Sequence, residues 1–155
     1  MKKILWSSVA LLSLVSGSAY ALTEKDVQDR VQMVCEQIKT AANPKAVFDK
    51  ITAGEHPYKD KADSSFYVFV YDESVTMMAH PTKTLVGENM KGKPDVRGKM
   101  FRDQIVEGAL AQGTGWVKYT YNKPGQSVDE RKKAYYQLCP NAGKKFIAVS
   151  GMYDE

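Results

Sequence analysis

The chain has 155 residues, of which 22 are lysine or arginine and 18 are aspartate or glutamate, so its formal net charge is +4. Positive and negative residues are interspersed, which argues against the clustered basic face of a nucleic-acid-binding protein. The basic runs at 131–133 and 144–145 fit solvated strand ends or turns. A chain of this length suffices for one domain with its own hydrophobic core.

The first 21 residues have the three parts of a signal peptide. Lys2 and Lys3 make a positive start, residues 4–15 are apolar apart from small serines, and residues 19–21 have the small-x-small cleavage pattern. The alternative, a membrane anchor, needs roughly 20 apolar residues, and this stretch has only about a dozen. We therefore expect cleavage after Ala21 and export to the bacterial periplasm or the medium. The mature chain, residues 22–155, would then be a single domain without a membrane span.

Two cysteines, Cys35 and Cys139, remain after this processing. An even number of thiols in an oxidising compartment favours a disulfide, here closing a loop of about 100 residues. The alternative is a pair of buried free thiols, since cysteine is a good small hydrophobe. Two distant cysteines and two histidines have no metal-ligand spacing, so we predict neither a metal site nor a cofactor.

Two helices are predicted first. One begins at Thr23, where Asp26 three residues later makes a weak capping box. Its apolar residues recur at helical spacing and include Cys35, which should therefore face the core. Asn43-Pro44 ends this helix and begins a second one, which Gly54 terminates. Residues 55–64 are polar and loop-like.

The rest of the chain has mostly strand character. Residues 66–71 and 75–80 predict a hairpin, because β-branched and aromatic residues dominate it and Asp72-Glu73-Ser74 makes a short turn. Residues 81–96 form a long irregular segment, a kind that is usually functional. A helix over 97–111 and strands over 116–121, 132–139 and 145–153 follow. This order predicts an α+β fold in which a five-stranded antiparallel sheet carries helices on one side.

Five blocks of the sequence, in this order, resemble the single Cache domain family of extracytoplasmic ligand sensors, whose fold is related to PAS domains. The blocks are FYVFVYDESVTMMAHP, LVGENM, DVRGKMFRDQIVEGALAQGTGWVKYTYNKP, KKAYYQL and FIAVSGMYDE. The resemblance covers residues 24–155. It implies a long N-terminal helix, a central antiparallel sheet, and a pocket roofed by the segment between the second and third strands.

The chain departs from the family pattern in two ways. The hairpin turn commonly carries a glycine in the family, and here it is Asp72-Glu73-Ser74. Relatives usually sit between two transmembrane helices of a chemoreceptor or kinase, whereas we expect this chain to lack a transmitter of its own.

The first strand and its neighbours supply most of the candidate ligand-binding residues. Tyr67, Phe69 and Tyr71 share one face by alternation, and buried phenols need polar partners. Either a pocket or a core edge open to water accounts for them. Tyr119 offers another phenol from the third strand. His80 ends the second strand, where it either bonds a ligand carboxylate or bonds a loop carbonyl.

The fourth strand supplies a second pair of candidates. Lys133 and Tyr135 share a face, and a cation beside a phenol at a pocket mouth suits a small carboxylate. The alternative for Lys133 is an exposed lysine at a strand start. Seven methionines show no ligand spacing for copper and fit packing.

No catalytic constellation is recognisable in the sequence, so we do not predict an enzyme. We expect a periplasmic binding module for a short carboxylate or amino-acid-like metabolite, which acts in signal transduction or chemotaxis through a membrane partner. The alternative is an interaction module that docks on an extracytoplasmic receptor or kinase domain without a ligand of its own. A third reading is a structural domain with a collapsed pocket, because fold alone does not define function.

Overall fold

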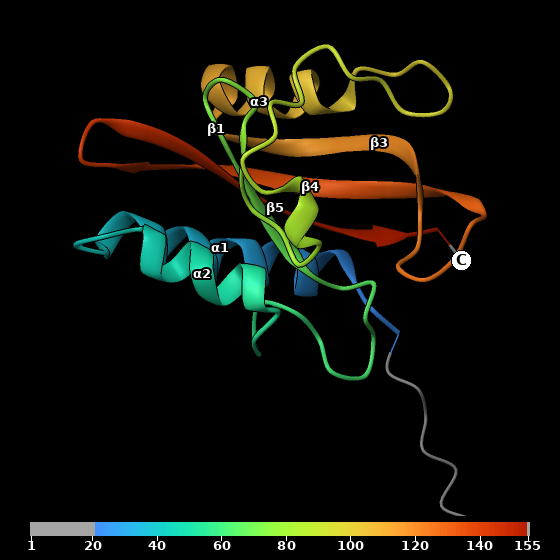
Figure 1. Ribbon diagram of the computed structural model, residues 1–155, viewed down its shortest axis with the longest axis horizontal. Coiled ribbons are helices and arrows are strands. Elements are labelled where there is room, and N and C mark those ends of the chain that lie inside the picture. The colour runs from blue at the N-terminus through green and yellow to red at the C-terminus, as the bar shows by residue number, and fades with distance from the viewer. Residues whose placement is uncertain (1–20, 155) are drawn as a thin grey trace, which may run out of the picture.

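The computed structural model describes residues 21–154 (Figure 1). Apart from Ala21, the predicted signal peptide lies outside these residues, so its cleavage stays a prediction. The elements, in chain order, are α1 (Glu24–Thr40), α2 (Lys45–Ala53), β1 (Val68–Asp72), β2 (Met77–Ala79), the short 3-10 helix η1 (Lys83–Leu85), α3 (Phe101–Gln112), β3 (Thr114–Asn122), β4 (Asp129–Asn141) and β5 (Lys144–Tyr153).

The start of α1 and the end of α2 lie where the sequence predicts, but α1 already ends at Thr40, before Asn43-Pro44, and α2 begins at Lys45. Thr23 caps α1, and the side chain of Asp26 completes the capping box. Gly54 ends α2 in the left-handed conformation, at a φ of 69°, and donates its N–H to Ile51 and Lys50. The apolar stripe of α1, including Cys35, is fully buried.

The five strands form one antiparallel sheet in the order β2-β1-β5-β4-β3. The C-terminal strand β5 is therefore central, between β1 and β4. The β1–β2 hairpin has a bulge between Val70 and Tyr71. Its turn places Val75 at a φ of 63°, a conformation that a β-branched residue rarely adopts. This left-handed position belongs to the turn in which the family pattern commonly has a glycine.

The prediction that the helices lie on one side of the sheet is wrong. α1 and α2 cover one face, while α3 and the preceding segment cover the other (Figure 1). The strands are apolar on both faces: Val70 and Ala148 pack with α1 and α2, and Val149 packs with α3. Two apolar faces require two covering layers, and the order of the helices along the chain does not say which face each helix covers.

Cys35 and Cys139 form a disulfide, as the sequence favoured. It joins the buried stripe of α1 to β4, across a separation of 104 positions. The bridge therefore fixes the N-terminal helix on one face of the sheet.

The segment between β2 and α3, residues 80–100, is tied to the sheet by the side chain of Asp95. Asp95 accepts hydrogen bonds from the backbone N–H groups of Arg97, Lys99 and Thr120, at 2.8–2.9 Å. Because Thr120 belongs to β3, this carboxylate ties the segment to the edge of the sheet. Gly98 has a φ of 83°, and α3 begins only at Phe101, four residues after the predicted start. We call residues 80–100 the roof.

Candidate functional site

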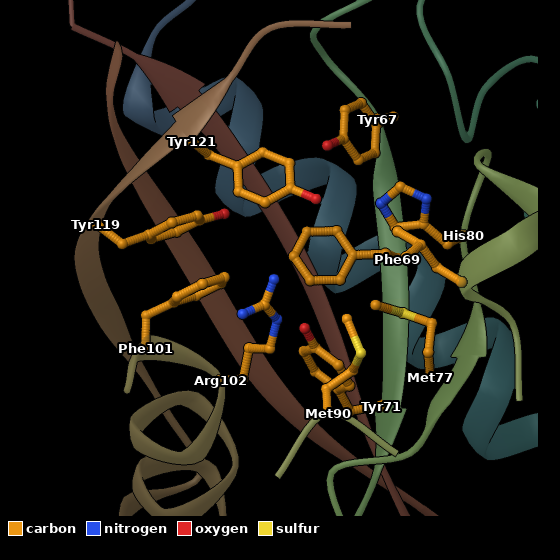
Figure 2. A pocket seen from close by; sticks show the side chains of 11 residues that line it. Tyr67, Phe69, Tyr71, Met77, His80, Met90, Phe101, Arg102, Tyr119 and Tyr121 are labelled. Carbon is orange, nitrogen blue, oxygen red and sulfur yellow. The ribbon is translucent and has the colours of Figure 1, made fainter. Parts of the chain in front are cut away.

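The main candidate site is a cavity that lies between the roof, α3 and the α3-covered face of the sheet. Figure 2 shows its side chains pointing toward a common centre. Its lining consists of aromatic, sulfur-containing and basic side chains: Tyr67, Phe69, Tyr71, Met77, His80, Leu85, Met90, Phe101, Arg102, Tyr119 and Tyr121.

The structure brings five of the sequence-predicted site residues together here. Tyr67, Phe69 and Tyr71 alternate along the start of β1 and share the cavity face. His80 follows β2, and its ring lies 5.2 Å from the Tyr67 ring and 5.6 Å from the Phe69 ring. Tyr119 reaches the same cavity from β3, which is the edge strand opposite β2.

Lys133 and Tyr135 lie on the opposite face of the sheet, so they do not stand at the mouth of this cavity. The Lys133 ammonium pairs with the Glu24 carboxylate of α1. The Tyr135 ring packs against Trp116, with centroids 5.3 Å apart, and borders the core beneath α1. Alternation along β4 correctly predicts that the two residues share a face, but it does not say which helix covers that face.

Arg102 is the charged side chain that the sequence analysis missed. It is 8 % exposed, its guanidinium lies 4.2 Å from the Phe101 ring centroid, and its Nη1 donates to the Lys93 carbonyl at 2.9 Å. It precedes Ile105 and Val106 by three and four positions, which places it on the buried stripe of α3. That spacing was the signal available in the sequence.

Phe101 and Tyr119 form the wall of the cavity next to Arg102. Their rings stack with centroids 3.9 Å apart and an angle of 3° between the planes. In Figure 2 the Tyr119 and Tyr121 hydroxyls and the Arg102 guanidinium point inward from this wall. The stack fixes the Tyr119 ring, and therefore the position of its hydroxyl.

His80 is neutral at physiological pH. Burial and the charges of Lys132 and Arg102 lower its pKa to about 4. Its Nδ1 accepts the Thr82 backbone N–H at 2.8 Å, so the proton of the neutral ring resides on Nε2. The histidine therefore bonds to a loop amide rather than to a loop carbonyl, and offers one ring N–H as a donor.

The buried tyrosines are also neutral. Burial raises the pKa values of Tyr67, Tyr71 and Tyr119, so each keeps its phenolic proton across the physiological range. For Tyr71 the nearby Arg102 charge opposes this rise. The cavity thus combines one permanent cation with several neutral hydroxyl donors.

The cavity is small and has no acidic side chain in its lining. Its volume is about 20 Å³, which is room for roughly one water molecule. Among residues 21–154, no group of histidine, cysteine, aspartate and glutamate is arranged to hold a metal ion. Within the same residues, no helix is long and apolar enough to cross a membrane.

The long N-terminal helix, the five-stranded antiparallel sheet and the cavity beneath the segment between β2 and α3 are the features that the resemblance to Cache domains implies. The family profile described as Single Cache domain 2 matches residues 14–154, and the chain belongs to this family. The sequence-based prediction of the family and of the fold class is confirmed, apart from the expectation that all helices lie on one side of the sheet.

Solved structures of similar fold are chemosensory domains. A periplasmic sensor domain of a chemotaxis protein is 24 % identical, with a TM-score of 0.63 over 84 % of this chain and 90 % of that one. A Cache chemosensory domain described for carboxylic acid recognition is 23 % identical, with a TM-score of 0.68 over 84 % and 92 %. A methyl-accepting chemotaxis protein from Vibrio parahaemolyticus is 18 % identical, with a TM-score of 0.65 over 83 % and 86 %.

Proposed function

We propose that this domain senses a short carboxylate, free or as part of an amino-acid-like metabolite, by binding it in the cavity beneath the roof. The observation that carries the proposal is the lining itself, which contains Arg102 and inward-pointing tyrosine hydroxyls but no carboxylate. Such a site stabilises an anion through charge-assisted hydrogen bonds and excludes cations. The recognition of a carboxylic acid by a similar Cache domain supports the same ligand class.

The size of the cavity restricts the ligand to a few carbon atoms. At about 20 Å³ the cavity must expand even for acetate. Leu85 and Met90 line it from the roof and Met77 lines it from the adjoining strand β2, and methionine side chains rearrange at low cost. We therefore expect the roof side to move on binding while the stacked Phe101–Tyr119 wall stays in place.

A thermal-shift and calorimetry panel tests this proposal on the protein without residues 1–21. Formate, acetate, propionate, lactate, pyruvate and the common amino acids are titrated, and a saturable rise in melting temperature is expected for at least one. Tyr119→Phe keeps the stacked ring but removes one hydroxyl donor. It should weaken binding of the best ligand roughly ten- to a hundredfold, because a hydrogen bond to a charged group is worth about 1.5–3 kcal/mol.

Tyr58→Phe is the matched control. The Tyr58 hydroxyl donates to Gln37 at 2.8 Å and lies on the α1 side of the sheet, so its loss should leave ligand affinity unchanged. Equal affinities of the wild type and Tyr119→Phe would mean that the ligand binds at another site. Absence of any shift across the panel would remove carboxylate sensing as the function.

The second part of the proposal is transmission to a membrane partner, a chemotaxis receptor or sensor kinase, after export and removal of residues 1–21. The resemblance to sensor domains of chemotaxis proteins supports it. Affinity capture from envelope extract, with and without the ligand found above, should enrich one such receptor or kinase in a ligand-dependent way. Capture that does not depend on ligand would favour the alternative, a docking module without a ligand of its own. The predicted cleavage after Ala21 is checked separately, by determining the N-terminal sequence of the exported protein.

A further inference from the structure

A lysine lies buried behind the cavity, in a position that the carboxylate site does not by itself explain. Lys132, on β4, is 1 % exposed and lies on the cavity face of the sheet. A buried ammonium without a close carboxylate is costly, and proteins usually keep one only where its charge has a use.

The surroundings of Lys132 are aromatic. Its Nζ lies 4.5 Å from the ring centroid of Tyr67 and 4.8 Å from that of Tyr153, between two π-faces. The same Nζ donates to the Tyr67 hydroxyl oxygen at 3.4 Å. Gly151 of β5 leaves room for the lysine stem, because a Cβ added there would lie 2.9 Å from Cε of Lys132.

The titratable groups around this lysine come from every neighbouring element. Tyr67 and Tyr153 flank it, and Tyr119 stands opposite it in the β3–β4 register. Asp63, in the loop before β1, raises its pKa, and His80 feels its charge from the end of β2. Burial outweighs Asp63 and lowers the pKa of Lys132 to about 7.

Tyr67 connects this lysine to the ligand site. In Figure 2 the Tyr67 hydroxyl points into the cavity, toward Tyr121. A phenol oxygen that accepts from Lys132 keeps its own proton free, and hydrogen bonds in such a chain strengthen one another. An anion beneath the roof can therefore accept the Tyr67 proton while Lys132 supports the same hydroxyl from behind.

We propose that Lys132 is a positioning residue that orients and polarises the Tyr67 hydroxyl, and that anion binding in the cavity is coupled to uptake of one proton by the Lys132 amine. The inference rests on the proposed function, because the anion is the ligand of that site. Before binding, the Lys132 side chain is a neutral amine. On binding it takes one proton from solvent, which gives an ammonium near the bound anion. By linkage, affinity for the anion falls as the pH rises above neutrality.

Isothermal titration calorimetry measures this proton directly. Formate, acetate and propionate are titrated into the protein without residues 1–21 at pH 8, in phosphate and in Tris, whose ionisation enthalpies differ. The difference in heat should correspond to uptake of about 0.4–0.9 protons, since Lys132 is mostly neutral at this pH before binding. At pH 5.5, where it is already charged, we expect no uptake at Lys132.

Three variants assign the proton. Lys132→Met keeps the apolar stem and should abolish uptake at pH 8, and weaken binding about tenfold at pH 6.5. His80 lines the cavity, so His80→Gln can change the affinity, but it should retain the uptake per mole of bound anion, because the histidine pKa of about 4 is too far below pH 8 to contribute. Lys118→Met is the matched control on an exposed β3 position and should behave as the wild type.

The outcomes distinguish failure of the proton coupling from failure of the carboxylate site. Binding without proton uptake in the wild type, or uptake that survives in Lys132→Met, overturns the coupling and leaves the carboxylate site standing. Absence of binding heat with all three acids overturns both. If Lys132→Met does not fold, Tyr67→Phe removes the connecting hydroxyl and must reduce the uptake for the coupling to stand.

Discussion

Removal of the disulfide gives the sharpest test of how the N-terminal helix is held on the sheet. Cys35→Ala and Cys139→Ala are combined, so that no free thiol remains. The bridge spans 104 positions, and the chain-entropy model gives about 4.7 kcal/mol for a loop of roughly 100 residues. Both sulfur atoms lie in the core beneath α1, and alanine keeps each Cβ but leaves the volume of the sulfur unfilled. We therefore expect the free energy of unfolding to fall by about 3–5 kcal/mol, and the melting temperature by about 10–20 °C.

Urea unfolding followed by Trp116 fluorescence measures this loss, since Trp116 is the tryptophan that remains after residues 1–21 are removed. Wild-type protein in reducing buffer serves as the control and should unfold at nearly the same urea concentration as the double variant. Alkylation before and after reduction, read by mass, should differ by two groups in the wild type. A stability loss below about 1 kcal/mol, or equal alkylation, would refute the argument.

Three further changes probe the cavity side of the sheet. Because the His80 pKa of about 4 lies below its ordinary value, the unfolded chain binds more protons between pH 6.5 and 4, so stability should fall by up to about 3 kcal/mol as the pH drops through this window. His80→Gln should flatten that profile in pH-dependent urea unfolding, and an unchanged slope would contradict the assignment. Gly108→Ala should lower the free energy of unfolding by about 1–2 kcal/mol, because its Cβ would lie 2.2 Å from the Tyr136 hydroxyl oxygen; this outweighs the helix preference of alanine. Adding Tyr136→Phe should recover part of the loss. Full stability of the Gly108→Ala variant would count against the contact between Gly108 and Tyr136. Asp95→Ala removes the acceptor that ties the roof to Thr120. Amide hydrogen exchange across residues 91–99 should therefore quicken roughly tenfold or more, while β4 and β5 stay protected. Equal exchange rates across residues 91–99 in the wild type and the variant would mean that other contacts hold the roof.

Local signals in the sequence were enough for most of the fold. The Thr23–Asp26 capping box and the apolar stripe with Cys35 predicted α1, and Gly54 predicted the end of α2. These features work within one turn of helix, so they are readable without tertiary structure. The predicted start of α3 is four residues too early, because Asp95 holds residues 97–99 in a turn, and one further hydrogen bond, from Thr120 of β3, ties that turn to the sheet.

The candidate site was only half readable for the same reason. Alternation placed Tyr67 and Tyr71 on one face of β1, since side chains in any strand alternate with period two. The same rule places Lys132 and Lys133 on opposite faces of β4, but it does not say which of the two faces meets the cavity. The tertiary structure decided that the Lys132 face meets the cavity and that the Lys133 face meets α1.

The sequence by itself thus determined the elements, the family and the sets of residues that share a face. Tertiary packing alone decided which helix covers which face, and with it the meeting of Arg102 from α3 with Tyr71 from β1. The physical reason is that hydrogen bonding and side-chain alternation act between near neighbours in the chain. Burial of an apolar face, in contrast, depends on which distant segment covers it.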